Sequence, residues 1–423
     1  MNSDRSFSGL IPIAIPPLEP PLPSTAPAAA APRLPRLACR MADMPPSAVR
    51  EILKVAERPD ILSFAGGLPA PELFPVAAIA EAHAEVLRND GGKALQYSTT
   101  EGFGPLRAWI AMHLRTRGIP ARPEELLITS GSQQGIDLVA RVFLDPGDVV
   151  LVDNPTYLAA IQSFAAYQVR LVTVPSDDQG MQVDDLADLI AAHRPKLIYV
   201  VSSFQNPRGT TLPQARRAAI AELAAHHGVA TIEDDPYGEL SFDGAPPRPI
   251  AAAGTGNVLY LGTFSKTLAP GLRIGWLWGD AGIVRKATIC KQAADLHTAT
   301  LAQRATASLL DRFDYAGHVA RICEVYRERC QTMLGALAEY LPDGSRWVAP
   351  TGGMFVWLQL PAQLDAEALF PEAIARKVAF VPGAAFFVES HRRDYIRLNF
   401  SNQPPLSIVE GMRRLGEVVA AAL

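Results

Sequence analysis

The stretch 196-KLIYVVSSFQNPRGTTL-212 passes from a continuous apolar run, Leu197–Val201, into a turn rich in polar residues. A strand is apolar along its whole length when both faces of its sheet are covered, as in parallel sheets flanked by helices. The run 149-VVLV-152 has the same character. Both stretches therefore predict buried strands of an α/β fold.

The same alternation continues on both sides of these runs, because short β-branched segments take turns with longer amphipathic ones. The strands predicted in this way are Leu126–Thr129, Val149–Val152, Val169–Val174, Lys196–Val201, Val229–Ile232, Val258–Leu261 and Ile274–Trp278. The helices predicted between them include Ser132–Phe143, Tyr157–Tyr167, Val183–His193 and Leu212–His227. This order indicates a large domain with a mostly parallel, doubly wound sheet.

From about residue 300 the pattern changes to long helical stretches followed by mixed strands. Helices are predicted at Leu301–Arg312, His318–Tyr340 and Ser407–Leu423, and strands in 353-GMFVWLQL-360 and 395-YIRLNF-400. We expect this part of the chain to form a smaller α+β domain packed on the first.

The composition excludes several classes of protein. The chain has 423 residues, 48% of them hydrophobic and 19% charged, which is enough for a large core. A formal net charge of −4 argues against nucleic acid as a partner. No segment has the roughly 20 apolar residues of a membrane-spanning helix. The four cysteines, at Cys39, Cys290, Cys323 and Cys330, have neither disulfide nor metal-site spacing, so we expect reduced thiols, no metal and a cytoplasmic protein.

The first forty residues differ from the rest of the chain. Nine prolines lie between positions 12 and 35, together with the run Ala28–Ala31, and such a composition cannot bury enough surface to fold. A secretory signal is the alternative, but Pro12, Pro16 and Pro17 interrupt the apolar run that it would need. A disordered extension is therefore predicted for residues 1–40.

Ligands of open α/β sheets bind beyond the carboxyl ends of the strands, so the polar residues at these positions are informative. In 128-ITSGSQQGIDL-138 a strand ends and a helix begins at Ser132, whose free amides and positive helix end favour an anion. The alternative is an ordinary helix start with Ser132 as its cap. The segment has no dinucleotide or ATP-binding motif.

Two further strands end in polar residues. Asn206 lies in the turn that follows Leu197–Val201, where an asparagine can also be purely structural. The stretch 231-TIEDDPYGEL-240 places Glu233, Asp234 and Asp235 at the end of an otherwise apolar strand. A buried carboxylate needs a cation, whereas a carboxylate at a solvated loop end does not.

The strand 258-VLYLGTFS-265 leads into Lys266, and Arg273 follows seven residues later. A lysine among apolar groups and hydroxyls has a lowered pKa and attacks carbonyls, although most single lysines are surface charges. The four strand ends together offer an amine for an aldehyde, a helix end and arginine for a phosphate, and an acid for a ring nitrogen. This set suits pyridoxal 5′-phosphate, with Asn206 and Tyr237 as donors to the ring oxygen.

From about residue 45 to its end, the chain resembles the fold-type I, class I/II aminotransferases. The motif TFSKTLAPGLRIGW resembles their Schiff-base signature, which implies that Lys266 binds the cofactor aldehyde and that Ser265 and Arg273 bind its phosphate. The family spacing D-x-x-Y selects Asp234, with Tyr237 three residues later, as the partner of the ring nitrogen. The motif N-P-x-G assigns Asn206 to the ring oxygen.

The resemblance extends to other segments. SGSQQ implies that Ser132 and Gln133 belong to the phosphate loop, and DNPTY implies that Tyr157 stacks on the ring. In LQYSTTEGFGPLR, Tyr97 corresponds to a tyrosine that reaches the phosphate from the neighbouring subunit, which implies a homodimer with shared active sites. In DYIRLNFS, Arg397 corresponds to the arginine that binds the substrate α-carboxylate.

Within the family, 61-ILSFAGGLPAPELFP-75 is most similar to the 2-aminoadipate/kynurenine aminotransferase group. This similarity implies that Gly67 helps to enclose the substrate. It also implies that 45-PPSAVREILKV-55 is a lid helix, with Ser47 and Arg50 as substrate contacts. Thr263 replaces a serine of many relatives but keeps the hydroxyl, and Pro45 and Pro46 precede the expected lid helix, where they bear on the substrate preference.

The predicted activity is therefore transfer of an α-amino group from aminoadipate, glutamate, leucine or an aromatic amino acid to a 2-oxo acid, expected to be 2-oxoglutarate. A lyase or decarboxylase on the same fold is the alternative, and an aminotransferase-like regulatory protein is a third. The domains expected are an extension at 1–40, an N-terminal segment with the lid helix at 41–90, a large cofactor-binding domain at 91–300 and a small domain at 301–423.

Overall fold

The computed structural model describes residues 35, 37–42, 58–245, 247–389 and 392–423. Residues Arg40–Leu423 form one compact unit, and the account below concerns that unit. Almost all of the predicted extension lies outside the described residues. The predicted lid helix, with Ser47 and Arg50, lies outside them as well.

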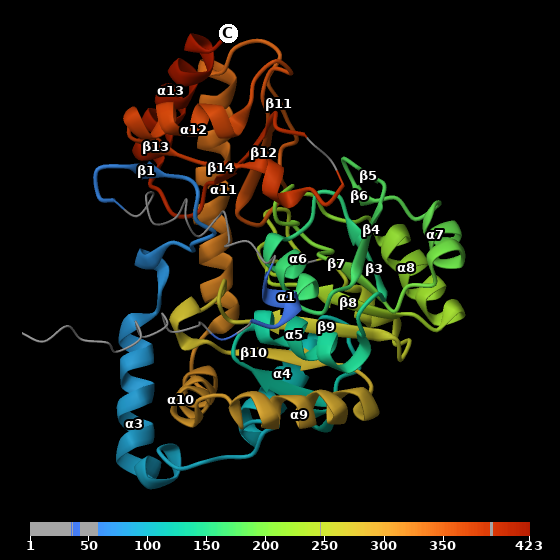
Figure 1. The fold of residues 1–423 in the computed structure, drawn as a ribbon. Helices are drawn as coiled ribbons and strands as arrows, with labels where there is room; N and C mark the ends of the chain where they lie inside the picture. The colour runs from blue at the N-terminus through green and yellow to red at the C-terminus, as the bar shows by residue number, and fades with distance from the viewer. Residues whose placement is uncertain (1–34, 36, 43–57, 246, 390–391) are drawn as a thin grey trace, which may run out of the picture. The chain divides into compact units, whose positions relative to one another are not determined.

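A seven-stranded sheet in the order β2-β10-β9-β8-β7-β3-β4 forms the centre of the large domain (Figure 1). All neighbours from β9 to β4 are parallel, and β10 is antiparallel to both β9 and β2. The prediction of a mostly parallel sheet is therefore confirmed. Its strands are β2 (Leu126–Thr129), β3 (Val149–Asp153), β4 (Arg170–Val174), β7 (Leu197–Val200), β8 (Ala230–Asp234), β9 (Val258–Thr263) and β10 (Gly275–Trp278).

Six of the seven strands are buried at every residue, and only the edge strand β4 is partly exposed. Helices cover the sheet, which explains the apolar runs. Helix α5 packs on β8, β9 and β10, α8 on β8, and α4 and α9 on β2. The helices are α3 (Val76–Ala94), α4 (Gly104–Thr116), α5 (Ser132–Phe143), α6 (Leu158–Ala165), α7 (Leu186–His193), α8 (Gln214–His227), α9 (Ala281–Asp295) and α10 (Thr300–Leu310).

A four-stranded antiparallel sheet, in the order β11-β12-β15-β14, forms the smaller α+β domain, as predicted. Its central register places Trp357 opposite Arg397. The N-terminal strand β1 pairs with β13 at the side of this domain. The elements are β1 (Leu62–Ser63), α11 (Tyr315–Tyr340), β11 (Arg346–Trp347), β12 (Phe355–Gln359), α12 (Ala366–Ala375), β13 (Val378–Ala379), β14 (Val381–Pro382), β15 (Tyr395–Asn399) and α13 (Pro405–Ala421).

The remaining elements are short. They are the helix α1 (Cys39–Ala42), the hairpin β5 (Ser176–Asp177) and β6 (Gly180–Met181), and the 3-10 turns Pro71–Leu73, Pro123–Glu125, Ile250–Ala253, Pro270–Leu272 and Gly383–Phe386. Within the described ranges, no helix is both long enough and apolar enough to cross a lipid bilayer. The domain boundaries expected at residues 40, 90 and 300 stay predictions.

Helices α11 and α13 approach each other closely in the small domain, and a glycine permits this. A Cβ at Gly416 would lie 2.3 Å from the backbone oxygen of Tyr340, so Gly416→Ala should lower the free energy of unfolding by about 1–3 kcal/mol. Gly335 of α11 is exposed and has no atom within 4 Å of such a Cβ, so Gly335→Ala should raise it by up to about 1 kcal/mol. Urea titrations measure both, and equal effects would contradict the packing argument.

Candidate active site

The carboxyl ends of three parallel neighbours, β7, β8 and β9, meet at one edge of the large sheet. Asn206 follows β7, Asp234 is the last residue of β8, and Lys266 lies three residues after the end of β9. A cavity of about 310 Å³ opens at this edge. The topology therefore places the three side chains around one space, as expected for an open α/β sheet.

Eleven of the residues singled out from the sequence line this cavity. They are Gly67, Ser132, Gln133, Tyr157, Asn206, Asp234, Tyr237, Ser265, Lys266, Arg273 and Arg397. Tyr97 does not line it, because its side chain is 79% exposed and makes its only described ring contact with His297. Ser47 and Arg50 lie outside the described residues.

Strand alternation separates the three consecutive carboxylates at the end of β8, because neighbouring side chains point to opposite faces. Asp234 lines the cavity, whereas Glu233 and Asp235 do not. Glu233 accepts hydrogen bonds from the Ser202 hydroxyl and from two backbone amides, and lies 3.7 Å from Arg217. Asp235 lies 2.9 Å from Arg117. Both other acids thus have their own partners on the face of β8 away from the cavity.

Among the described residues, Asp234 itself has no such cation. The Tyr199 hydroxyl donates to its Oδ2 at 2.8 Å, and no described group donates a hydrogen bond to its buried Oδ1. Burial raises the pKa of Asp234 to about 7, Tyr199 lowers it in part, and the charge of Asp235 raises it further. The site therefore holds a buried carboxylate whose ionised form calls for a cationic donor from the cavity.

Lys266 reaches the cavity from the loop after β9. Its Nζ donates to the backbone oxygen of Gly67 at 2.7 Å. Burial lowers its pKa to about 8, and the positive charges of Arg397 and Arg273 contribute to this shift. A larger fraction of the amine is therefore neutral near physiological pH than in an exposed lysine, which is the state that attacks carbonyl carbons.

An anion-binding cup lies next to Lys266, where helix α5 begins at Ser132. Ser265 and Thr263 share a hydroxyl–hydroxyl hydrogen bond of 2.9 Å at the rim of the cup. Arg273 adopts a left-handed backbone conformation with φ 54°, and its Nη2 donates to the backbone oxygen of Ser130 at 2.8 Å. Hydroxyls, a guanidinium and a helix N-terminus thus converge on the same part of the cavity.

Gly131 is required for this closure. Its φ is 81°, and a Cβ at this position would lie 2.5 Å from Nη2 of Arg273. Gln133 lies at the cup, but its side-chain amide donates to Ser163 Oγ at 2.8 Å and so faces helix α6. Any contact between Gln133 and a phosphate would therefore come from its backbone.

Arg397 enters the site from β15 of the small domain. Its guanidinium donates to Asn206 Oδ1 at 2.8 Å and to the backbone oxygen of Ala65 at 2.6 Å. The guanidinium carbon lies 4.5 Å from the ring centroid of Phe355 and 5.2 Å from that of Phe386. Burial lowers its pKa to about 10, so Arg397 is a cation at neutral pH without a described acidic partner. A carboxylate is the natural ligand of such a group.

These residues fit pyridoxal 5′-phosphate. The orphaned Oδ1 of Asp234 suits a protonated ring nitrogen, and the cup closed by Gly131 and Arg273 suits the phosphate. Lys266 suits the aldehyde. Within the described residues, no cluster of three or more histidine, cysteine or acidic side chains could hold a metal ion.

Several residues that the sequence did not indicate contact the site residues or their neighbours. The Tyr199 hydroxyl donates a hydrogen bond to Asp234. The sequence feature that could have indicated Tyr199 is its position in the apolar run Leu197–Val201, which is followed by Asn206. Tyr315 donates to Glu239 and lies 2.9 Å from Thr267, the neighbour of Lys266. His113 of α4 lies 3.1 Å from Glu239. The sequence carries no signal for the last three contacts, because the residues are far apart in the chain.

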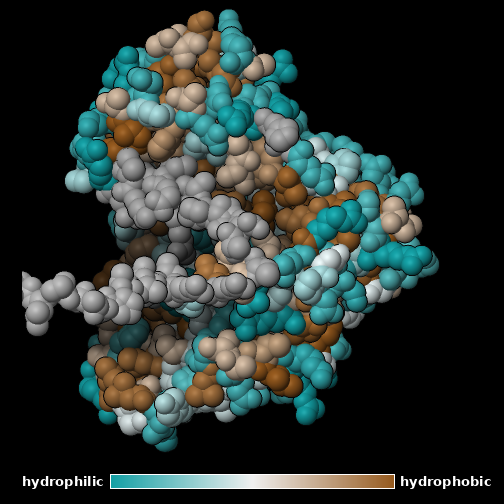
Figure 2. Space-filling view, in the orientation of Figure 1, coloured by the Kyte–Doolittle hydropathy of each residue, from teal (hydrophilic) through white to brown (hydrophobic). Residues whose placement is uncertain are grey.

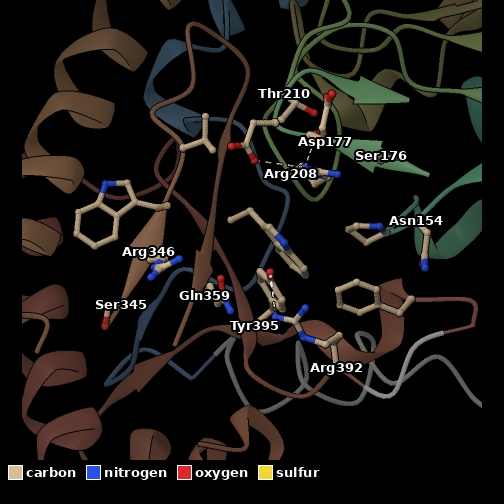
Figure 3. Close-up of a pocket in the computed structure, with 16 residues that line it drawn as sticks. Asn154, Ser176, Asp177, Arg208, Thr210, Ser345, Arg346, Gln359, Arg392 and Tyr395 are labelled. Carbon is tan, nitrogen blue, oxygen red and sulfur yellow. Dashed lines mark hydrogen bonds and ion pairs between the residues drawn. The ribbon is translucent and has the colours of Figure 1, made fainter. Parts of the chain in front are cut away.

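A larger cavity, of about 780 Å³, lies between hairpin β5–β6 and the small sheet (Figure 3). Arg346, Gln359 and Tyr395 line it from the small sheet, and Arg208 lines it from the large domain. Figure 2 shows apolar residues in the region between the upper and the right-hand parts of the molecule, although most of the residues that line the cavity are polar or charged. The cavity shares no lining residue with the site at Lys266. The chemistry of the lining, and not cavity size, therefore identifies the candidate active site.

Comparisons with known proteins agree with this chemistry. The sequence pattern of the family described as "Aminotransferase class I and II" matches residues 60–415. The aromatic-amino-acid aminotransferase 1 of Thermococcus litoralis is 45% identical over 89% of this chain and 92% of its own length. The 2-aminoadipate transaminase of Thermus thermophilus is 44% identical over 89% of this chain and 94% of its own.

A solved structure is similar as well. The α-aminoadipate aminotransferase of Thermus thermophilus, complexed with N-(5′-phosphopyridoxyl)-L-leucine, superposes with a TM-score of 0.86 at 42% identity and covers 92% of this chain and 98% of its own. The predicted fold type, enzyme class and cofactor are thereby confirmed. The chain belongs to the class I and II aminotransferases and is a pyridoxal-phosphate-dependent transaminase.

Proposed function

We propose that this enzyme transfers the α-amino group of aromatic, aliphatic and acidic L-amino acids to a 2-oxo acid, with 2-oxoglutarate as the acceptor. The observation that carries the proposal is one cavity in which Lys266, Asp234 and Arg397 come together from β9, β8 and β15. An amine, an acid and a carboxylate-binding guanidinium are the groups that transamination of an α-amino acid needs.

Each residue has a defined task in this proposal. When bound, pyridoxal phosphate supplies an aldehyde and a ring that accepts electrons from the substrate Cα. Asp234 holds the proton on the ring nitrogen, and Asn206 and Tyr237 hold the ring oxygen. Tyr157 packs on the ring. Ser132, Ser265 and Arg273 hold the phosphate, with the backbone of Gln133 beside them.

Arg397 and Lys266 act on the amino acid. Arg397 would bind the α-carboxylate and orient the Cα–H bond toward Lys266, whose neutral Nζ would take the proton from Cα and hold it as an ammonium group. Gly67 encloses the substrate, because its backbone oxygen lies 2.7 Å from that Nζ. A carboxylate held by a buried guanidinium stays on the substrate, which favours transamination over decarboxylation.

The walls near Arg397 support a range of side chains. Phe355 and Phe386 flank its guanidinium, and apolar walls of this kind suit aromatic and aliphatic groups. An acidic side chain needs a further cation, and we assign this role to Arg50, with Ser47 as a second contact; both residues lie outside the described ranges. The similar proteins are named for aromatic amino acids and for 2-aminoadipate, which supports the same range.

A homodimer with shared sites is part of the proposal. Tyr97 and Leu95 are 79% and 72% exposed and lie two residues apart in the chain, so together they offer apolar surface that an interface would cover. In the dimer, Tyr97 of one subunit contacts the phosphate of its partner. The proposed compartment is the cytoplasm, because Cys290, Cys323 and Cys330 are free thiols, which suits a reducing environment.

The role of Lys266 predicts a pH dependence. Since burial lowers its pKa to about 8, the cofactor-free enzyme should capture pyridoxal phosphate covalently at a rate that rises as the pH rises through 8 and then levels off. Stopped-flow absorbance measures this rate. Lys266→Ala should have no turnover and no such absorbance change, while it still binds pyridoxamine 5′-phosphate. A rate that keeps rising toward pH 10 would contradict the lowered pKa.

The role of Arg397 predicts a selective loss. Arg397→Gln removes a charge-assisted bond to the α-carboxylate, worth about 2–3 kcal/mol, so KM for every amino donor should rise roughly thirtyfold or more. The measurement is oxo-acid formation from phenylalanine, leucine, glutamate and 2-aminoadipate with 2-oxoglutarate. Cofactor absorbance should be unchanged. The exposed Arg346→Gln is the matched control, and an equal rise in KM there would refute the assignment.

The shared site predicts complementation between two inactive variants. Tyr97→Ala and Lys266→Ala damage the same site from different subunits, so a mixed dimer has one site with both defects and one intact site. Co-refolded mixtures should therefore recover up to about a quarter of wild-type activity, given random pairing of subunits. Sedimentation establishes the dimer independently. A mixture that stays inactive although dimers form would show that Tyr97 does not act across the interface.

A further inference from the structure

Arg117 lies at the C-terminal end of helix α4 and has a side chain that is only 8% exposed. Its Nη2 lies 2.9 Å from Oδ2 of Asp235, whose side chain is fully buried. Its Nη1 donates to the Tyr260 hydroxyl at 2.7 Å, and this hydroxyl donates to the same Asp235 oxygen at 3.0 Å. Arg117, Tyr260 and Asp235 thus form a closed, buried triangle.

The surrounding chain packs tightly around this triangle. A Cβ at Gly238 would lie 2.4 Å from Oδ1 of Asp235 and 2.6 Å from Nη2 of Arg117. Burial by itself lowers the pKa of Arg117, but the oxygens of Tyr260, Asp235 and Glu239 outweigh it and raise the pKa above its usual value. Arg117 is therefore a permanent cation that compensates Asp235 in a region of low dielectric constant.

Asp235 directly follows Asp234, the acid that faces the cofactor cavity. The backbone amide of Asp235 donates to Leu261 of β9 at 2.9 Å, so its position is fixed by the sheet. Its negative charge disfavours ionisation of Asp234. Other titratable or charged groups also surround Asp234. Tyr199 of β7 contacts it directly, and the cavity contributes two tyrosines and three cations: Tyr157, Tyr237, Lys266, Arg273 and Arg397.

We propose that Arg117 is a positioning residue that keeps Asp234 ionised for the cofactor ring nitrogen by neutralising Asp235 on the opposite face of β8. The inference deepens the proposed function and rests on the role of Asp234 in it. Arg117 does not line the cavity, and it acts only through Asp235. Without Arg117, the charge of Asp235 would act on Asp234 without compensation, and the pair of adjacent buried carboxylates would take up a proton at higher pH.

The test uses pyridoxamine 5′-phosphate, which has the ring nitrogen and the phosphate but no aldehyde for Lys266. Its affinity for the full chain stripped of cofactor is measured by calorimetry between pH 5.5 and 9. Binding should weaken as the pH falls through the pKa of Asp234, because the neutral acid no longer attracts the protonated ring. Arg117→Met should weaken binding at pH 7 by about tenfold or more. We call the part of the affinity–pH curve in which binding weakens at low pH the acid limb. Arg117→Met should also move this acid limb to higher pH, by about one pH unit.

Asp235→Asn should move the acid limb in the opposite direction, to lower pH, because it removes the repelling charge. The double variant Arg117→Met with Asp235→Asn should return the limb close to that of wild type. If the acid limb lies at the same pH in all variants and only their melting temperatures fall, the inference is overturned and Arg117 is a purely structural residue. If Arg117→Met does not fold, the direction of the shift in Asp235→Asn decides.

A matched control comes from the other compensated acid. Arg217 lies 3.7 Å from Glu233, whereas Arg117 lies 2.9 Å from Asp235, the acid whose charge raises the pKa of Asp234. Arg217→Met should therefore lower thermal stability and move the acid limb less than Arg117→Met does. A limb that moves as far as in Arg117→Met would overturn the specific role of Arg117. Asp234→Ala tests the underlying assignment separately. If that variant binds pyridoxamine 5′-phosphate as tightly as wild type, the proposed role of Asp234 fails.

Discussion

The constraint on which the rest of the site depends is a buried carboxylate, Asp234, that has no cation of its own in the part of the chain that the structure describes. Leaving an ionised acid in a low-dielectric interior is costly, and the protein accepts this at one position only among three consecutive acids. Glu233 and Asp235 each have a buried arginine, from α8 and from the end of α4. The uncompensated charge thus faces the one place where a cofactor with a protonated ring nitrogen can meet it.

The cations of the site are arranged by the same logic. Lys266 shares its cavity with Arg273 and Arg397, and their positive charges, together with burial, make its amine less basic. A lysine paired with a carboxylate would have the opposite shift and would be a poor nucleophile. One cavity of about 310 Å³ therefore contains two separate charge arrangements. Asp234 offers a negative charge for the ring nitrogen, and the guanidinium groups lower the basicity of the Lys266 amine.

The two domains divide the work between cofactor and substrate. The large sheet supplies the acid, the lysine and the anion cup, whereas Arg397 comes from a strand of the small sheet. The contact between Arg397 and Asn206 links the two parts directly at the site. In the proposed function, the substrate carboxylate and the cofactor ring are therefore held by residues of different sheets.

The layered fold could be predicted from the sequence, because the period of apolar residues follows directly from which faces of a strand are covered. Each predicted strand of the large sheet lies within about two residues of an observed one, as β2 and Leu126–Thr129 illustrate, a margin usual for element boundaries. The antiparallel direction of β10 could not be predicted. Strand direction depends on how the loop through Lys266 and Arg273 turns back, and apolar periodicity is the same in either direction.

The site could be predicted in part. Polar residues that directly follow an apolar strand, such as Asn206 and Asp234, can be recognised in the sequence, and the topology of the sheet brings these strand ends to one edge. Arg397 could be named only through the resemblance to a family, since nothing local links β15 to that edge.

The amino-acid sequence by itself determined the strands of the large sheet, the named helices between them and the polar chemistry of the strand ends, and the family spacing selected Asp234. Only the tertiary structure decided which charges are compensated. Arg117 and Asp235 are more than a hundred residues apart in the chain, and so are Lys266 and Gly67. Pairing over such separations leaves no local pattern, because it depends on how helices and strands pack and on the low dielectric constant of the space that they enclose.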